Sequence, residues 1–288
     1  MTSYVNCVAV LGTGARLIQI ERVEAIRFDR IMTAGRTSPL LLTCEKTDGS
    51  VVEAVVKFAT GKECTQSSLC AEMIASQLAA DLGLPTPTPV IVTWNSEFAL
   101  SLVDQQARQI VMESTPPAFG STLVTDGFTA WSAGRKIVGH DARQVALAIF
   151  FFDAMIGNSD RGGMKPNILV RGEAFRLIDH EMAFQDYLLI MKRAPPWAIG
   201  GLNGLVAPGA HIFTVQLAKA TKDLDFTPIR AAWADLSDGQ IEAYEASLPL
   251  EWTADRRLTT FAVTRIKECR NRIDDCVAEC RRALNVGT

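Results

Sequence analysis

Three shortages narrow what this chain of 288 residues can be. Its three histidines are too dispersed to form a zinc site with the available cysteines. Positive charge is not in excess, because 29 Lys and Arg stand against 32 Asp and Glu, a net charge of −3. No overall basic field therefore draws the chain to nucleic acid or to an acidic membrane. The most apolar run, residues 145–152, ends at Asp153 and is too short to span a bilayer.

Disulfide signatures are also missing. The seven cysteines are scattered, odd in number and form no CxxC pair, which favours reduced thiols in a cytoplasmic protein. The first 15 residues lack the basic region of a signal peptide. What is present is ordinary globular composition, 48% hydrophobic and 21% charged, in a chain long enough for one large domain or two lobes.

The first third of the chain is rich in predicted strands. Residues 23–31, 40–44 and 51–58 favour an antiparallel meander, with an Asp48-Gly49 hairpin turn between the second and third strands. Residues 89–94 predict a further strand. The Pro-rich stretch 114–120 breaks the pattern, and we place the boundary between two lobes there.

Helical periodicity dominates the remainder. One helix, 67–82, lies within the first lobe and is stopped by Gly83 and Pro85. Residues 97–113 favour another helix, and Asp141 is expected to cap a buried helix that runs to residue 156. Further helices are expected at 212–222, 226–235, 238–247 (with a Ser237–Gln240 capping box) and 254–284. The fold class is therefore α+β, with a β-rich first lobe and a helical second lobe.

The segment 157–184 carries the densest candidate chemistry. Residues 167–170 and 175–178 predict a hairpin, which would place Asn167 beside Asp179, with Asp160 just upstream. An amide and two carboxylates suit Mg²⁺ and phosphate, and indicate phosphoryl transfer. A lone Asp160 would more often be a turn residue. Arg161 and Lys165 are either solvated loop cations or help for a transferring phosphate.

A second candidate site lies in the first lobe. Lys57 ends a strongly β-forming run, where burial would be costly without an anionic partner. Glu72, on the following helix, supplies that partner, and such a pair orients a lysine toward ATP phosphates. The alternative is an edge-strand lysine that reaches water.

Two glycine-containing turns are weaker signals. The turn at Gly35, followed by Thr37 and Ser38, could cover phosphates with its backbone N–H groups, although an ordinary hairpin fits nearly as well. Phosphorylation at Thr37 or Ser38 would then repel ATP. Gly12-Thr13-Gly14 is no dinucleotide fingerprint, because Leu17 replaces the third glycine and no βαβ unit follows.

These motifs, in this order over about residues 33–185, resemble the HipA-like kinases. The resemblance implies a two-lobed kinase fold with ATP and Mg²⁺ in the cleft: a first lobe at 1–113, a hinge at 114–124 and a helical lobe at 125–288. It implies that Lys57, held by Glu72, binds ATP phosphates, with Lys165 and the Gly35–Ser38 turn nearby. The remaining implied roles are a catalytic Asp160, metal-binding Asn167 and Asp179, and adenine contacts from Phe119, Gly120 and Ser121.

The chain departs from the pattern of eukaryotic kinases in three places. Asp160 and Asn167 are seven residues apart, where the eukaryotic catalytic loop has five. Five residues before Asn167 stands Gly162, which cannot act as a base. Ser159 replaces a histidine, and Asp179-His180-Glu181 replaces Asp-Phe-Gly. The longer toxins of the family carry an extra N-terminal subdomain that has no clear equivalent here, so a DNA-binding antitoxin partner gains no support.

The reading that follows is an ATP- and Mg²⁺-dependent kinase acting on protein Ser or Thr. A small-molecule or lipid kinase is the alternative among enzymes, since no Ala-Pro-Glu anchor follows Asp179. A nucleotide-binding pseudokinase that works through a partner is the alternative of another class. The expected partner is a protein or small-molecule phosphoacceptor, with neither nucleic acid nor membrane.

Overall fold

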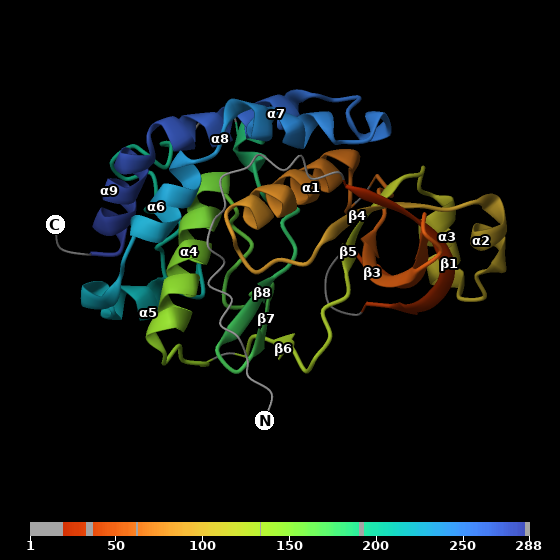
Figure 1. Cartoon of the computed structure of the whole chain (residues 1–288), viewed down its shortest axis with the longest axis horizontal. Coiled ribbons are helices and arrows are strands. Elements are labelled where there is room, and N and C mark those ends of the chain that lie inside the picture. Colours follow the sequence, from red (N-terminus) through yellow and green to blue (C-terminus); the bar gives the residue numbers. More distant parts are fainter. Residues whose placement is uncertain (1–19, 33–36, 62, 133, 190–192, 286–288) are drawn as a thin grey trace.

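The chain forms a strand barrel joined to a larger helical part, an α+β arrangement (Figure 1). This computed structural model describes residues 20–32, 37–61, 63–132, 134–189 and 193–285. Gly35 and the Gly12-Thr13-Gly14 stretch lie outside the described residues. The barrel holds one hydrophobic cluster and the helical part holds a second, larger one.

The barrel is built from five strands in the order β1-β2-β3-β5-β4. The meander predicted from the sequence is confirmed, because β1 pairs with β2 and β2 with β3, all antiparallel. Closure was not predicted, and it comes from parallel pairing of β1 with β4. The strand bounds are β1 Glu21–Ile31, β2 Leu40–Lys46, β3 Val51–Lys57, β4 Pro89–Thr93 and β5 Ala118–Thr122.

The single helix expected over 97–113 is wrong. The structure has two short helices, α2 (Ser96–Ser101) and α3 (Gln105–Met112), at the outer side of the barrel. Each begins with its own cap, since Asn95 accepts a hydrogen bond from the Phe98 N–H at 2.8 Å and Asp104 accepts one from Ala107 at 2.9 Å. A second N-cap inside the stretch restarts the helix.

Helix α1 (Gln66–Asp81) lies between the barrel and the helical part (Figure 1). Thr65 and Ser68 form a capping box at its start. All its residues from Leu69 to Ala79 are buried, because the helix contacts β4 and β5 on one side and α7 and α8 on the other. Its apolar side chains belong to the core of the helical part, not to the barrel interior.

The helical part is organised around α4 (His140–Ile156), which is almost wholly buried from Ala146 onward. Asp141 does not cap it: Gly139 is the cap, and Asp141 lies in the first turn. The predicted capping box of Ser237 and Gln240 is confirmed. The other helices are α5 Thr214–Lys219, α6 Thr227–Ala234, α7 Asp238–Ala246, α8 Arg257–Asn271 and α9 Ile273–Ala283, with 3₁₀ turns at Gln185–Leu188, Thr221–Asp223 and Leu250–Trp252.

The continuous helix expected over 254–284 is also wrong, because the chain breaks at Arg272, where φ is −117° and ψ is 31°. Buried apolar positions with helical spacing nevertheless continue from α8 into α9 across the break. The six positions are all buried: Ala262, Ile266, Cys269, Ile273, Cys276 and Cys280.

A small sheet carries part of the segment 157–184, in which most of the candidate site residues lie. Strands β7 (Ile168–Arg171) and β8 (Ala174–Leu177) form the predicted hairpin, and β6 (Thr129–Ala130) adds to β7. The Leu177 N–H donates to the Pro85 carbonyl at 2.7 Å, which fixes the hairpin to the segment that follows α1. The hairpin is thereby held against the first lobe.

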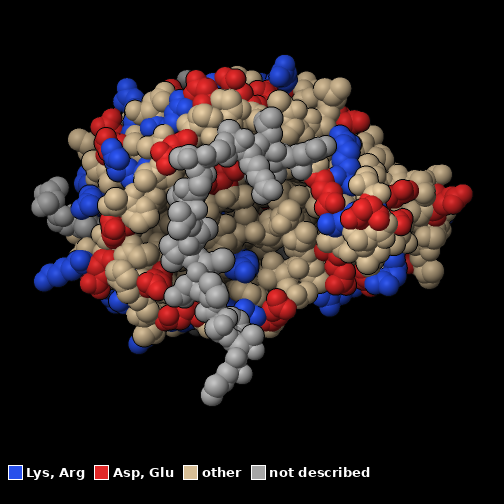
Figure 2. Space-filling view, in the orientation of Figure 1, with Lys and Arg blue, Asp and Glu red and all other residues tan. Residues whose placement is uncertain are grey.

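The face drawn in Figure 2 is hollowed between the barrel and the helices, and it mixes acidic with basic side chains. Among the described residues, no helix has the length and apolar character needed to cross a bilayer. All six described cysteines are free and buried, at positions 44, 64, 70, 269, 276 and 280.

Candidate active site

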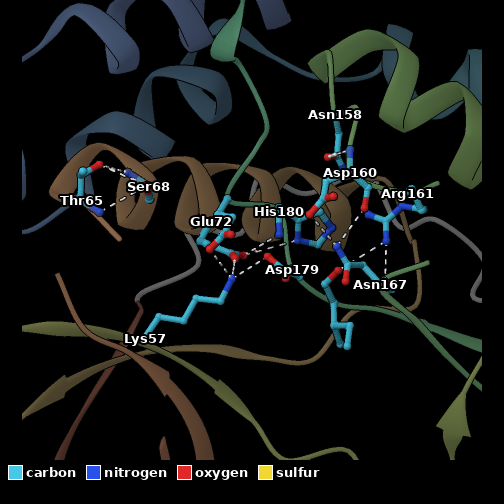
Figure 3. Close-up of polar contacts among 12 residues, drawn as sticks. Lys57, Thr65, Ser68, Glu72, Asn158, Asp160, Arg161, Asn167, Asp179 and His180 are labelled. Carbon is cyan, nitrogen blue, oxygen red and sulfur yellow. Dashed lines mark hydrogen bonds and ion pairs between the residues drawn. The ribbon is translucent and has the colours of Figure 1, made fainter. Parts of the chain in front are cut away.

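Lys57 lies at the centre of an acidic cluster (Figure 3). It ends β3, and its Nζ forms ion pairs with Glu72 of α1, with Asp179 at 2.6 Å and with Glu181 at 3.2 Å. Lys57 is 6% exposed and Glu72 is 1% exposed. The structure therefore brings together the two halves of the site that the sequence predicted separately.

Within the cluster, Lys57 and Glu72 hold each other in their charged forms. Burial alone would lower the pKa of Lys57, but the attraction of its three carboxylates outweighs it and raises the pKa well above its usual range. Burial opposes ionisation of Glu72 as well, yet Lys57 and His180 hold the pKa of that carboxyl far below its usual range. Lys57 and Glu72 therefore form an ion pair of two charged groups in a buried setting.

Glu181 is the member that sequence reasoning missed. It was noted only as part of the Asp179-His180-Glu181 replacement for Asp-Phe-Gly. Its carboxylate is 7% exposed, and burial together with the charges of Asp179 and Glu72 raises its pKa, although Lys57 acts in the other direction. The available signal was its position two residues after Asp179, a carboxylate already assigned to the site.

His180 braces the far side of Glu72. Its backbone N–H donates to Glu72 Oε2 at 2.9 Å, and its ring packs edge-on against Phe152 of α4 with 5.8 Å between ring centroids. The side chain is 1% exposed. The residue in the place of the Phe of Asp-Phe-Gly thus joins the segment carrying Asp179 to both α1 and α4.

Asp160 and Asn167 form the second half of the site, next to Asp179 (Figure 3). Asn167 Nδ2 donates to the Asp160 carbonyl at 2.9 Å and to Asp160 Oδ2 at 3.2 Å. No described residue bonds to Asp160 Oδ1, Asn167 Oδ1 or Asp179 Oδ2. Three side-chain oxygens thus have no partner among the described residues. The predicted hairpin does bring Asn167 next to the segment that enters Asp179, because the Ile178 N–H donates to the Asn167 carbonyl at 3.1 Å.

The seven-residue interval from Asp160 to Asn167 is absorbed by a tight turn. Gly162 and Lys165 form an isolated antiparallel bridge, so the residues between them project outward, and Met164 is 97% exposed. The Gly163 N–H donates to the Gly209 carbonyl at 3.3 Å, which anchors the turn. Lys165 is exposed and forms no ion pair with a described residue, so its role at ATP stays a prediction.

The prediction that Arg161 is a solvated loop cation is wrong, and its burial also argues against contact with a transferring phosphate. Its side chain is fully buried and paired with Asp153 at the end of α4. The sequence did not predict this ion pair, because Asp153 was interpreted only as the residue that ends an apolar run.

The predicted adenine-binding residues lie in β5. Phe119 pairs with Lys57 and Gly120 with Val56, while β4 bonds the opposite edge of β5. A Cβ on Gly120 would approach Val92 Cγ2 to 2.7 Å, so the barrel interior requires glycine there. Because β5 is bonded on both edges, the segment after Leu123 is the better source of free backbone groups. The contacts predicted for Phe119, Gly120 and Ser121 stay predictions.

Ser38 follows the part of the β1–β2 connection that lies outside the described residues, which includes Gly35. It has a φ of 44°, in the left-handed region, and is half-exposed. Its predicted place over ATP phosphates stays a prediction.

A cavity of about 450 Å³ borders the loop that leads into Asp160. The residues that line it include Gly157, Ser159, Asp186 and Gly201. Ser159 directly precedes Asp160, so the cavity adjoins the loop that carries the predicted base.

Comparison with solved structures supports the fold. The proinflammatory kinase CtkA of Helicobacter pylori has a TM-score of 0.52 and 11% sequence identity, over 93% of this chain and 99% of that chain. HipA of Shewanella oneidensis MR-1, solved with HipB and operator DNA, has a TM-score of 0.43 and 13% sequence identity, over 90% of this chain and 68% of that chain. Macrolide 2′-phosphotransferase MphH of Brachybacterium faecium has a TM-score of 0.28 and 10% sequence identity, over 91% of this chain and 94% of that chain. Only the first score is high enough to carry an argument, and it concerns the fold alone.

Comparison at the level of sequence identifies the family. No curated protein sequence matches the chain. The family model described as HipA-like kinase, however, matches residues 25–195, more than half of the chain. The matched region includes Lys57, Glu72, Asp160, Asn167 and Asp179. The chain therefore belongs to the HipA-like kinase family, a family of phosphotransferases.

Proposed function

We propose that this chain is a kinase that transfers the γ-phosphoryl group of ATP, with Mg²⁺, to a Ser or Thr hydroxyl of a protein. One observation carries the proposal. Lys57 of β3, Glu72 of α1 and Asp179, which lies 122 positions after Lys57, meet in a single ion-pair cluster. That arrangement is the one by which kinases hold ATP phosphates and metal.

The residues present fit a divalent cation. Three carboxylates surround one ammonium group, so the cluster of Glu72, Asp179 and Glu181 has an excess of negative charge. The unbonded oxygens of Asn167 and Asp179 are hard ligands of the kind that Mg²⁺ prefers. A metal held there would neutralise charge on the phosphates.

The remaining residues would bind ATP and orient the acceptor hydroxyl. Lys57, held by Glu72, would contact the α- and β-phosphates. Asp160 would accept the proton of the acceptor hydroxyl through Oδ1, while Asn167 holds its other oxygen. Backbone groups that follow β5 would bind adenine.

The test is transfer of radiolabelled phosphate from ATP to lysate proteins in the presence of Mg²⁺. Asp160→Asn and Asp179→Asn should each reduce transfer by about 100-fold or more. Asp141→Asn, which changes an exposed carboxylate in the first turn of α4, is the matched control. Full transfer by both active-site variants would contradict the proposal. A phosphoproteome comparison of cells expressing wild type and Asp160→Ala would then identify the acceptor.

The cavity beside Ser159 favours a second candidate, a kinase for a small molecule. About 450 Å³ lies within the range of small-molecule sites. The same radiolabel assay separates the candidates when lysate is divided into protein and metabolite fractions. Label that appears only in the metabolite fraction, and depends on Asp160, would establish the small-molecule activity.

A further inference from the structure

Arg161 is a buried arginine in the loop between Asp160 and Asn167. The chemistry proposed above assigns it no role. Its Nη2 donates to Asp153 Oδ1 at 3.2 Å, and its Nε donates to Asp153 Oδ2. Asn158 adds a bond to Oδ1 at 2.9 Å and His211 Nε2 adds one to Oδ2 at 3.0 Å. The Phe213 N–H donates to His211 Nδ1, so the neutral ring carries its proton on Nε2 and donates to Asp153. Every oxygen of Asp153 is thus committed to holding its neighbours.

The remaining nitrogen of Arg161 reaches the backbone of both predicted metal ligands. Nη1 donates to the Asn167 carbonyl at 2.6 Å and lies 3.4 Å from the Ile178 carbonyl. The first carbonyl belongs to the peptide that leaves Asn167, and the second to the peptide that enters Asp179. Nη1 of Arg161 therefore contacts the backbone next to both Asn167 and Asp179, and can fix the orientation of both side chains.

Those two peptides need support, because both residues have left-handed backbones. φ is 47° at Asn167 and 62° at Asp179, a region that residues other than glycine rarely adopt. Such conformations persist only where the surroundings over-determine them, and they cluster at functional sites. The Ile178 N–H also donates to the Asn167 carbonyl at 3.1 Å, so the two residues are linked to each other as well as to Arg161.

We propose that Arg161, fixed by Asp153 and His211, is a positioning residue that aims Asn167 and Asp179 at the metal–nucleotide site. It acts through these two ligands and does not contact the phosphates. The proposal rests on the proposed function, since it assigns a role within the same site. Residues behind the direct ligands commonly set metal affinity in this way.

The test measures metal binding, not turnover. Mn²⁺ is titrated into the full chain with a non-hydrolysable ATP analogue and followed by electron paramagnetic resonance. Arg161→Lys keeps the charge but cannot span Asp153 and the two carbonyls, so Mn²⁺ affinity should fall by about 10- to 100-fold. Arg270→Lys is the matched control, because Arg270 is a half-buried arginine that bonds the Leu236 carbonyl and Asp238, away from the site. It should bind Mn²⁺ as wild type does.

A second measurement separates positioning from general stability. In the nucleotide-free protein, amide hydrogen exchange of Ile178 should accelerate in Arg161→Lys, while exchange in the barrel strand β2 stays as in wild type. If Arg161→Lys does not fold, the milder His211→Gln replaces it, with an expected loss of about 3-fold or more in Mn²⁺ affinity.

Wild-type Mn²⁺ affinity in the folded Arg161→Lys variant, or in His211→Gln where that variant replaces it, would overturn the positioning role. Uniformly faster exchange across barrel and hairpin would overturn it too, because it would make Arg161 a contributor to overall stability only. Failure of the proposed function looks different: the wild-type chain itself would bind no Mn²⁺ with the nucleotide analogue.

Discussion

Asp153 is the carboxylate that allows Arg161, in the loop between Asp160 and Asn167, to lie buried. Burial disfavours its charged form, but Arg161 and His211 together lower its pKa from 3.8 to about 2. A folded-state pKa below the unfolded value adds stability above pH 4, and this is lost as the pH falls toward 2. The difference corresponds to about 2 kcal/mol of unfolding free energy.

The pH dependence of unfolding checks this value. Urea unfolding between pH 6 and pH 3 should show wild type losing stability more steeply below pH 4 than Asp153→Asn does. The variant is less stable at pH 6, because a neutral amide leaves Arg161 without its counter-charge. Asp141→Asn, at an exposed site, should keep the wild-type slope. Parallel curves for wild type and Asp153→Asn would show that this carboxylate does not titrate with unfolding.

Residue chemistry made part of the site predictable. Lys57 required an anion, and Glu72 on the next helix was the nearest candidate, so the ion pair followed from the cost of burying a charge. Arg161 was misread because its environment depends on the end of α4 and on His211, 50 positions away along the chain. Sequence pattern shows which residues are polar, but not which polar residues the fold encloses.

Elements were predictable where a local signal defined both ends. The Asp48-Gly49 turn and the β-forming runs on either side of it predicted β2 and β3, and Gly49 has the expected positive φ of 82°. The break at Arg272 was missed because apolar positions with helical spacing continue across it. The break at Leu102 was missed because the stretch 97–113 was read as one element. The missed signals were present: Asp104 is an N-cap, and acidic residues in the first turn of α9 follow a basic one in the last turn of α8.

The capping box of α1 gives a prediction at the scale of one element. Thr65 Oγ1 accepts a hydrogen bond from the Ser68 N–H at 3.2 Å, and Ser68 Oγ accepts one from the Thr65 N–H at 3.3 Å. Thr65→Ala should lower the unfolding free energy by about 1 kcal/mol, measured by urea denaturation. Glu72 lies two turns further on, so affinity for the ATP analogue should remain that of wild type. Ser67→Ala, in the same turn but without a side-chain hydrogen bond to a described residue, is the control. Equal losses in both variants would contradict the capping role.

At the scale of the whole molecule, the position of α1 was the least predictable feature. Its sequence indicates one apolar stripe, whereas the structure buries its middle on every side. The reason is long-range: closure of the barrel through β1 and β4 presents β4 and β5 to one face, and α7 and α8 cover the other. Tyr244 bonds Asp81 at 2.6 Å and Trp252 bonds the Pro117 carbonyl at 2.8 Å, so the helical part is tied to both α1 and the approach to β5.

This shared helix should make the two lobes unfold together. Leu78 is fully buried in α1, so Leu78→Ala should cost about 2–5 kcal/mol. Because α1 joins both parts, amide exchange of the slowest peptides should accelerate by the same factor in β2 of the barrel and in α4. Leu250→Ala, at a leucine 87% exposed, should change neither. Faster exchange in α4 with unchanged β2 would mean that the barrel is independently stable, and Lys57 would then be held by Glu72 across a boundary between two separately folding units.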